Sequence, residues 1–203
     1  MKTIKPIKNI DLYKYVYAPE KESPICSPSL RGVYHTDGFA VASDAFILVA
    51  DKSLYDERFE NQIIDKNRVV ISKAYPNWKG TLPKYTKSAS CDFLRLKEYL
   101  DDIKTKQFTF WKEQKETYGK QYKCSQKNFL NKTIINLRIN DVLLSINYHN
   151  LSRFVDYCLY IGAEQIKHGD GRQPLYAWND KGCVLAMPRN LATFDKVFFN
   201  YTI

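Results

Sequence analysis

Apolar residues recur at helical spacing in two long segments of the chain. They fall every three or four positions over 91–104 and again over 150–160, with polar and charged residues between them. This pattern gives each segment one apolar face to turn toward a core, so it predicts a helix in each. A shorter helix is predicted over 9–17, because Pro19 would stop it there.

Short runs of β-branched and aromatic residues lie between the predicted helices and are typical of strands. Turn sequences separate several of these runs, among them Thr36-Asp37-Gly38 and Asn140-Asp141. We predict strands over 30–35, 39–42, 45–50, 61–72, 107–111, 133–139, 142–147, 174–178 and 182–187.

Two further segments show neither the helical spacing nor the strand-like runs described above. Residues 73–90 contain Pro76, Gly80 and Pro83 and are predicted to be a connector. Residues 112–131 are polar and are predicted to form a mobile loop or the tip of an extended hairpin. The aromatic and apolar tail, 192–203, is expected to pack against the rest of the fold.

The order of these elements predicts an α+β fold. A helix followed by several strands recurs about three times, which favours helices packed on one face of largely antiparallel sheets. Strict alternation of single strands and helices is missing, so a doubly wound nucleotide-binding fold is not expected. A chain of 203 residues can form one large or two small domains.

Composition adds a charge imbalance to this picture. Lysine and arginine number 31 against 22 acidic residues, giving a net charge of +9 and a pI near 9.2. Such a balance favours an anionic partner, of which nucleic acid is the commonest. The five cysteines are widely spaced and form no C-x-x-C, so we expect reduced thiols and no zinc site. No segment is typical of a signal peptide or membrane span, so we expect a cytoplasmic protein without membrane contact.

Three stretches carry a more specific pattern. The first comprises 30–34 (L-R-G-V-Y) and 40–49 (A-V-A-S-D-A-F-I-L-V), and the second is 75–83 (Y-P-N-W-K-G-T-L-P). The third runs from 142 to the segment 183–189 (C-V-L-A-M-P-R). In this order they resemble the beta subunit of bacterial DNA polymerase III, the sliding clamp. Its matching segments read L-x-G-V with V-A-T-D-G-H-R-L, then F-P-D-Y-R-x-V-I-P, then Y-L-V-M-P-M-R.

The chain departs from the clamp pattern in several places. It is too short for the three similar domains that the family carries, and we expect two clamp-like lobes, 1–87 and 88–203. Ala45 stands where the family has glycine, and Arg189 replaces the second methionine of M-P-M. Twelve residues follow Leu191, and this tail could cover a nearby peptide groove.

The resemblance implies a function without catalysis. It indicates sequence-independent association with double-stranded DNA, as a tether or processivity-type factor, in a possible homo-oligomer. It also implies a groove for a peptide of a replication or mobile-element protein. The residues assigned to this groove by the resemblance are Leu175, Met187, Pro188 and Leu191.

A clamp needs positive charge that follows phosphates without reading bases. Two basic stretches, 66–87 and 104–127, supply it, and lysine predominates over arginine in both. Lysine suits diffuse attraction to phosphates, whereas the arginine fork suits base reading. The lysines predicted to contact DNA are Lys73, Lys79, Lys84, Lys87, Lys112, Lys115, Lys120 and Lys123.

Two other functions stay open. The chain could keep the clamp fold as a protein-interaction module without DNA contact. It could also be an enzyme with an unrecognised site, such as a metal-dependent nuclease using His35, Asp37 and Asp44. Local spacing assembles no nucleophile with a base and no set of metal ligands, so we expect no catalytic residue, no metal and no cofactor.

Overall fold

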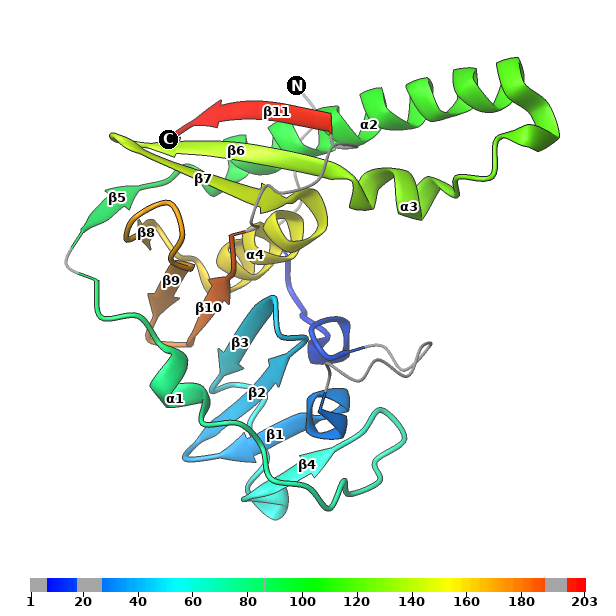
Figure 1. The fold of residues 1–203 in the computed structure, drawn as a ribbon. Coiled ribbons are helices and arrows are strands. Elements are labelled where there is room, and N and C mark those ends of the chain that lie inside the picture. Colours follow the sequence, from blue (N-terminus) through cyan, green and yellow to red (C-terminus); the bar gives the residue numbers. More distant parts are fainter. Residues whose placement is uncertain (1–6, 18–26, 86, 189–196) are drawn as a thin grey trace.

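The computed structural model describes residues 7–17, 27–85, 87–188 and 197–203 (Figure 1). Its main feature is an eight-stranded sheet in the order β4-β1-β2-β3-β10-β9-β8-β5, in which every pairing is antiparallel. The strands are β1 (Val33–Thr36), β2 (Phe39–Ser43), β3 (Ile47–Asp51), β4 (Gln62–Ile64), β5 (Ser88–Ser90), β8 (Gln165–Lys167), β9 (Leu175–Asn179) and β10 (Gly182–Ala186).

Strands from the two ends of the chain meet at the centre of this sheet. β3 pairs with β10 over five residues, and Val49 lies opposite Val184. The strands on one side of this junction all come from the range 1–87, and those on the other side all come from 88–203. This arrangement is consistent with the two predicted lobes, whose division stays a prediction.

A second, smaller sheet has the order β11-β6-β7. β6 (Thr133–Ile139) and β7 (Val142–Asn147) form the predicted antiparallel hairpin, with its turn at Asn140. β11 (Val197–Thr202) adds in parallel to β6, so the described part of the tail packs against the fold as expected.

Two long helices, α2 (Phe93–Tyr118) and α4 (Tyr148–Ile161), pack against each other. α4 also contacts both sheets, and its apolar face lies in the largest core cluster. The Asn147 side chain caps its start, and Gly162, with φ +75°, ends it. Among the described residues, none of the helices combines the length and apolarity that crossing a membrane requires.

The two faces of the large sheet are covered differently. Alternate residues such as Val49 and Val184 face the main core around α4. Their neighbours Leu48 and Leu185 face a smaller apolar cluster closed by Trp78. Trp78 belongs to the short helix α1 (Trp78–Thr81), within the predicted connector.

The structure overturns two predictions in the middle of the chain. Residues 107–111 are not a strand but part of α2, although Phe108, Thr109 and Phe110 alternate in polarity. Residues 112–131 are not a loop, because α2 continues to Tyr118. A 3₁₀ turn, η4 (Gly119–Gln121), and α3 (Gln126–Asn131) follow it. Few apolar residues mark this part of α2, so its pattern gave no helical signal.

Two predictions near the N-terminus are also wrong in extent. The helix expected over 9–17 is only the 3₁₀ turn η1 (Leu12–Lys14), because the chain turns to bond Leu30 through the Tyr17 amide. The strand expected over 61–72 is limited to β4. The Asp65 carboxylate accepts the Asn67 and Val69 amides and closes a turn immediately after it.

Candidate functional site

An apolar pocket lies beside the β3–β10 junction. Its volume is about 220 Å³. Four segments form it: the 3₁₀ turn η2 (Pro28–Arg31), the β2–β3 turn, the end of β10, and the connector around α1. The lining residues are Leu30, Ser43, Ala45, Phe46, Ile47, Leu48, Tyr75, Pro76, Trp78, Thr81, Leu185 and Met187.

The pocket wall offers hydrophobic contact rather than charge. Its lining contains no ionisable acid or base apart from the Tyr75 phenol, and burial raises the pKa of that phenol. The hydroxyls of Ser43 and Thr81 donate to the Ile47 and Trp78 carbonyls, at 2.9 and 2.6 Å. A ligand of this pocket would therefore be held mainly by burial of its own apolar groups.

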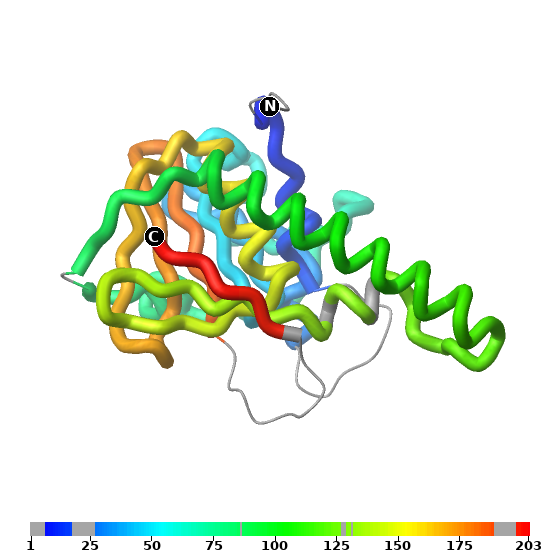
Figure 2. The backbone as a smooth tube through the Cα atoms, turned by 90° about the horizontal axis from the view of Figure 1, so that it is seen from above, coloured from blue at the N-terminus to red at the C-terminus, as the bar shows by residue number. Residues whose placement is uncertain are grey.

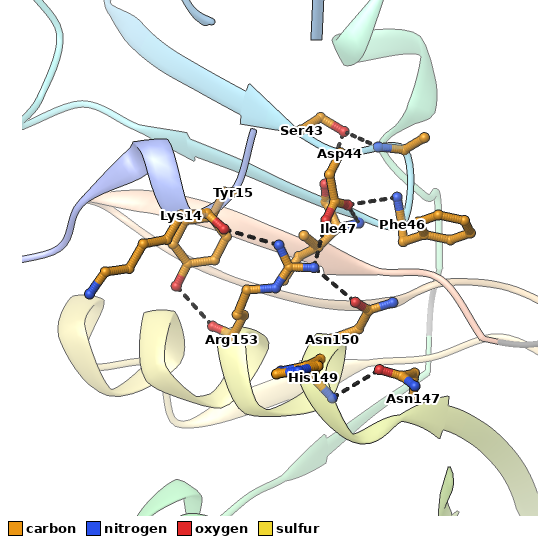
Figure 3. Close-up of polar contacts among 11 residues, drawn as sticks. Lys14, Tyr15, Ser43, Asp44, Phe46, Ile47, Asn147, His149, Asn150 and Arg153 are labelled. Atoms are coloured by element: carbon orange, nitrogen blue, oxygen red, sulfur yellow. Dashed lines mark hydrogen bonds and ion pairs between the residues drawn. The ribbon is translucent and has the colours of Figure 1, made fainter. Parts of the chain in front are cut away.

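The β2–β3 turn shapes one wall of the pocket. Figure 3 shows the polar contacts that hold this turn. The Asp44 carboxylate accepts the amides of Phe46 and Ile47, each at 3.0 Å. Ala45 has a φ of +72°, a conformation that suits glycine better than alanine. The turn leaves the Phe46 side chain 49% exposed at the pocket.

An ion pair from α4 fixes this turn from behind. Arg153 Nη2 lies 2.6 Å from Asp44 Oδ2 and also donates to Asn150 Oδ1 at 2.8 Å. Its Nη1 donates to the Lys14 carbonyl, and the guanidinium lies over the Tyr15 ring (Figure 3). Arg153 therefore joins α4, the N-terminal 3₁₀ segment and the pocket turn.

Trp78 also lines the pocket and is buried. The Asn77 side chain caps α1 by accepting the Gly80 amide at 3.1 Å. The Trp78 ring packs edge-on against Phe39, with centroids 5.5 Å apart. Nearby, Tyr75 stacks on Tyr34. Trp78 thus anchors the connector to the sheet.

The predicted groove residues have separate locations. Met187 lines the pocket, and its amide donates to the Phe46 carbonyl at 2.8 Å. Pro188 follows it but does not line the pocket, and Leu175 is buried in the main core. Leu191 lies outside the described residues. Sequence reasoning did not assign the lining residues of 43–48 and 75–81 to a groove, although both lie within the stretches that resemble the clamp.

The predicted DNA-contacting lysines are all exposed, but they form two separate groups. Lys73, Lys79, Lys84 and Lys87 follow the connector around α1. Lys112, Lys115, Lys120 and Lys123 lie at the far end of α2 and in η4 and the segment after it. Figure 1 shows these two regions at opposite ends of the molecule.

Lys79 is already paired within the chain. Its Nζ lies 2.8 Å from Asp37 Oδ2, and this contact lowers the pKa of Asp37. Both side chains are more than half exposed, so the pair is weak and phosphates could compete for the lysine.

The residues considered for a metal site are not gathered together. His35 Nδ1 accepts the Asp56 amide at 3.1 Å, and burial lowers the histidine pKa. Asp37 and Asp44 pair with Lys79 and Arg153, respectively. Across the described parts of the chain, no group of three or more histidine, cysteine or acidic side chains could hold a metal ion.

The four described cysteines are free thiols: Cys91, Cys124, Cys158 and Cys183. Burial raises the pKa of Cys91 to about 12 and that of Cys183 to about 11. These two thiols are therefore protonated near neutral pH, as expected for small apolar residues of a core.

The solved structures that this chain resembles include bacterial clamps. The DNA polymerase III subunit beta of Pseudomonas aeruginosa has a TM-score of 0.58 at 11% identity, covering 91% of this chain and 64% of that one. A ligand-bound sliding clamp from the same organism has a TM-score of 0.55 at 11% identity, covering 88% and 62%. The chain has the fold of a bacterial sliding clamp. The DNA polymerase III beta chain of Streptococcus pneumoniae agrees, with a TM-score of 0.54 at 12% identity, covering 88% and 61%.

The clamp fold confirms the predicted α+β class and the resemblance drawn from the three sequence stretches. The chain spans less than two thirds of the length of these three clamps. No protein-family model matches the sequence, and no curated protein matches it. The likeness therefore concerns the fold.

Proposed function

We propose that this chain is a non-catalytic, clamp-like tether. It holds a short apolar segment of a partner protein in the pocket and stays near double-stranded DNA through sequence-independent attraction. The observation that carries the proposal is the apolar pocket at the junction of the two halves of the large sheet. A replication or mobile-element protein is the partner that we expect.

The size and chemistry of the pocket support a peptide ligand. About 220 Å³ accommodates one or two apolar side chains, and full burial of each contributes roughly 1.5–3 kcal/mol. Such an anchor alone gives modest affinity, so neighbouring backbone contacts would have to add to it. The surrounding sheet is a fixed support, which lowers the entropic cost of binding.

The pocket can be tested without disturbing the core. Phe46 is exposed at the pocket, so Phe46→Asp places a charge there while leaving the buried strands intact. Leu94→Asp is the matched control, because Leu94 on α2 is 50% exposed and does not line the pocket. The probe is a fluorescent peptide with two adjacent leucines, compared with the same peptide carrying two aspartates.

We expect Phe46→Asp to weaken binding of the leucine peptide by tenfold or more and Leu94→Asp to leave it unchanged. The aspartate peptide should not bind either variant or the unaltered protein. Equal binding of the leucine peptide by both variants would contradict a role for the pocket.

The DNA half of the proposal rests on charge. The net charge of +9 and the eight exposed candidate lysines support attraction to phosphates. Because the chain is shorter than the clamps that it resembles, a ring would need several copies. Measuring the solution mass with and without a DNA duplex tests oligomer formation and DNA association together.

A second candidate is an interaction module that binds a partner but no DNA. Lys79 is paired with Asp37, and α4 contains no lysine. Both features reduce the positive charge available to phosphates, so they favour this alternative. Absence of duplex binding at low salt, with leucine-peptide binding retained, would select this alternative.

We infer no nuclease activity. His35, Asp37 and Asp44 each bond to a different partner within the fold, which supports structural roles. Cleavage of a DNA duplex in the presence of magnesium or manganese, abolished by Asp44→Ala, would overturn this inference.

A further inference from the structure

The C-terminal half of α2 leaves the body of the molecule and forms a helical arm. We define the arm as residues 108–125, which comprise the end of α2, η4 and the segment leading to α3. Gln107 is the last buried residue of α2, and every described arm residue is at least partly exposed. Figures 1 and 2 show α2 extending beyond both sheets before the chain turns back toward α3.

Internal contacts give the arm a defined shape. Trp111 Nε1 donates to the Cys124 carbonyl at 2.9 Å, which joins the outgoing helix to the returning segment. Phe110 packs on Phe129 at the base of the return, with centroids 5.8 Å apart. Gly119, with φ +53°, ends α2 and allows the chain to reverse. The arm is therefore an ordered projection rather than a loop.

The lysines of the arm differ from those nearer the body in their ion pairing. Lys97 pairs with Asp101 and Asp156, and Lys106 pairs with Asp102. Farther along, the arm carries four lysines against Glu113 and Glu116. None of these four lysines takes part in an ion pair within the part of the chain that the structure describes. They are Lys112, Lys115, Lys120 and Lys123.

Exposed and unpaired ammonium groups on a projecting element are suited to an anionic surface. Lysine is depleted from the cores of protein–protein interfaces, so its density here favours a phosphate backbone over a protein. The Lys115 ammonium lies 5.0 Å from the centroid of the Trp111 ring, in a cation–π contact. Lys115 can keep this contact while it binds a phosphate. Tyr118, 53% exposed at the end of α2, carries a hydroxyl of the kind that contacts phosphate oxygens.

We propose that the helical arm is the main DNA-contacting site of this chain and binds the phosphodiester backbone of a duplex through Lys112, Lys115, Lys120 and Lys123. The inference rests on the DNA half of the proposed function and places that contact outside the body. The connector lysines lie at the opposite end of the molecule and are secondary (Figure 1).

The test compares two quadruple lysine-to-glutamine variants of the full chain. One changes Lys112, Lys115, Lys120 and Lys123, and the matched control changes Lys66, Lys73, Lys84 and Lys87. Both sets are exposed and remove the same charge. Binding to a fluorescent random-sequence duplex is measured by anisotropy over a series of salt concentrations, with leucine-peptide binding measured on the same samples.

Each phosphate contact contributes about 0.9 to the slope of log affinity against log salt, so four arm contacts contribute roughly 3 to 4. We expect the arm variant to lose at least tenfold in affinity at low salt and most of this slope. The control variant should retain most of both. Equal losses in the two variants, or an unchanged slope in the arm variant, would overturn the arm site while leaving DNA association intact.

Absence of duplex binding by the unaltered chain would overturn both the arm site and the DNA half of the proposed function. Peptide binding would still report separately on the pocket. A single strand of the same length serves as a second ligand. Tighter binding of that strand than of the duplex would contradict the duplex assignment.

Discussion

The guanidinium of Arg153 on α4 lies 2.6 Å from the carboxylate of Asp44 in the β2–β3 turn. These residues are 109 positions apart in the sequence. Their contact fixes the turn that contains Phe46, whose side chain lines the pocket. The ion pair therefore couples the central helix to the shape of the candidate site.

Removal of this coupling should destabilise the protein. Arg153→Ala leaves the largely buried Asp44 carboxylate without its cation, which typically costs about 3 kcal/mol. Lys106→Ala, which breaks an exposed pair within α2, should cost less than about 0.5 kcal/mol. Urea unfolding measures both. A loss for Arg153→Ala no greater than for Lys106→Ala would show that the pair carries no stability.

The strained position in the same turn gives the opposite expectation. Ala45 has φ +72°, and relief of its Cβ contact in Ala45→Gly should stabilise the fold by about 0.5–1 kcal/mol, after the entropic cost of glycine. Ala42→Gly, on buried β2 without positive φ, should instead destabilise by about 1 kcal/mol. Thermal unfolding of the two variants should therefore shift in opposite directions.

Removal of the buried Tyr157 hydroxyl on α4 should cost more stability than removal of the exposed Tyr160 hydroxyl. Tyr157 donates to Asp51 Oδ2 at 2.8 Å, and Asp51 is fully buried. Tyr157→Phe leaves that oxygen short of a donor and should cost about 2 kcal/mol in urea unfolding. Tyr160→Phe removes an exposed hydroxyl near Ser53 and should cost less than about 0.5 kcal/mol. Similar losses in the two variants would contradict this difference.

Stability should fall as the pH is lowered from 7.5 toward 5.5. Burial lowers the pKa of His35 below its ordinary 6.5, so the folded state binds fewer protons than the unfolded state in this window. The neutral ring is favoured because its Nδ1 accepts the Asp56 amide. His35→Gln removes this titration, and urea unfolding at several pH values should show a flatter dependence. An equally steep dependence in the variant would assign the effect to other groups.

Local patterns predicted the elements that depend on local interactions. α4 has an apolar stripe and a terminating Gly162, both visible in the sequence, although the helix starts at Tyr148, two residues earlier than predicted, after the capping Asn147. The β6–β7 hairpin has alternating residues and a turn at Asn140. These elements were recognised because their own side chains determine their conformation.

Features made by distant segments were less visible. The arm part of α2 lacks an apolar stripe because little of it faces a core, so its helix went unpredicted. Of the pocket, only Met187 was assigned beforehand, because its other walls come from segments far away in the sequence. The Asp44–Arg153 contact carries no local signal at all.

The pairing of β3 with β10 determines when, during synthesis and folding, the pocket can form. Residues 47–51 pair with 182–186, so the pocket cannot form before residues 182–186 have been synthesised. Pairings between such distant segments delay folding, because loop closure precedes the gain from contact. Partner recognition through this pocket would therefore exclude chains in which residues 182–186 have not yet paired with residues 47–51.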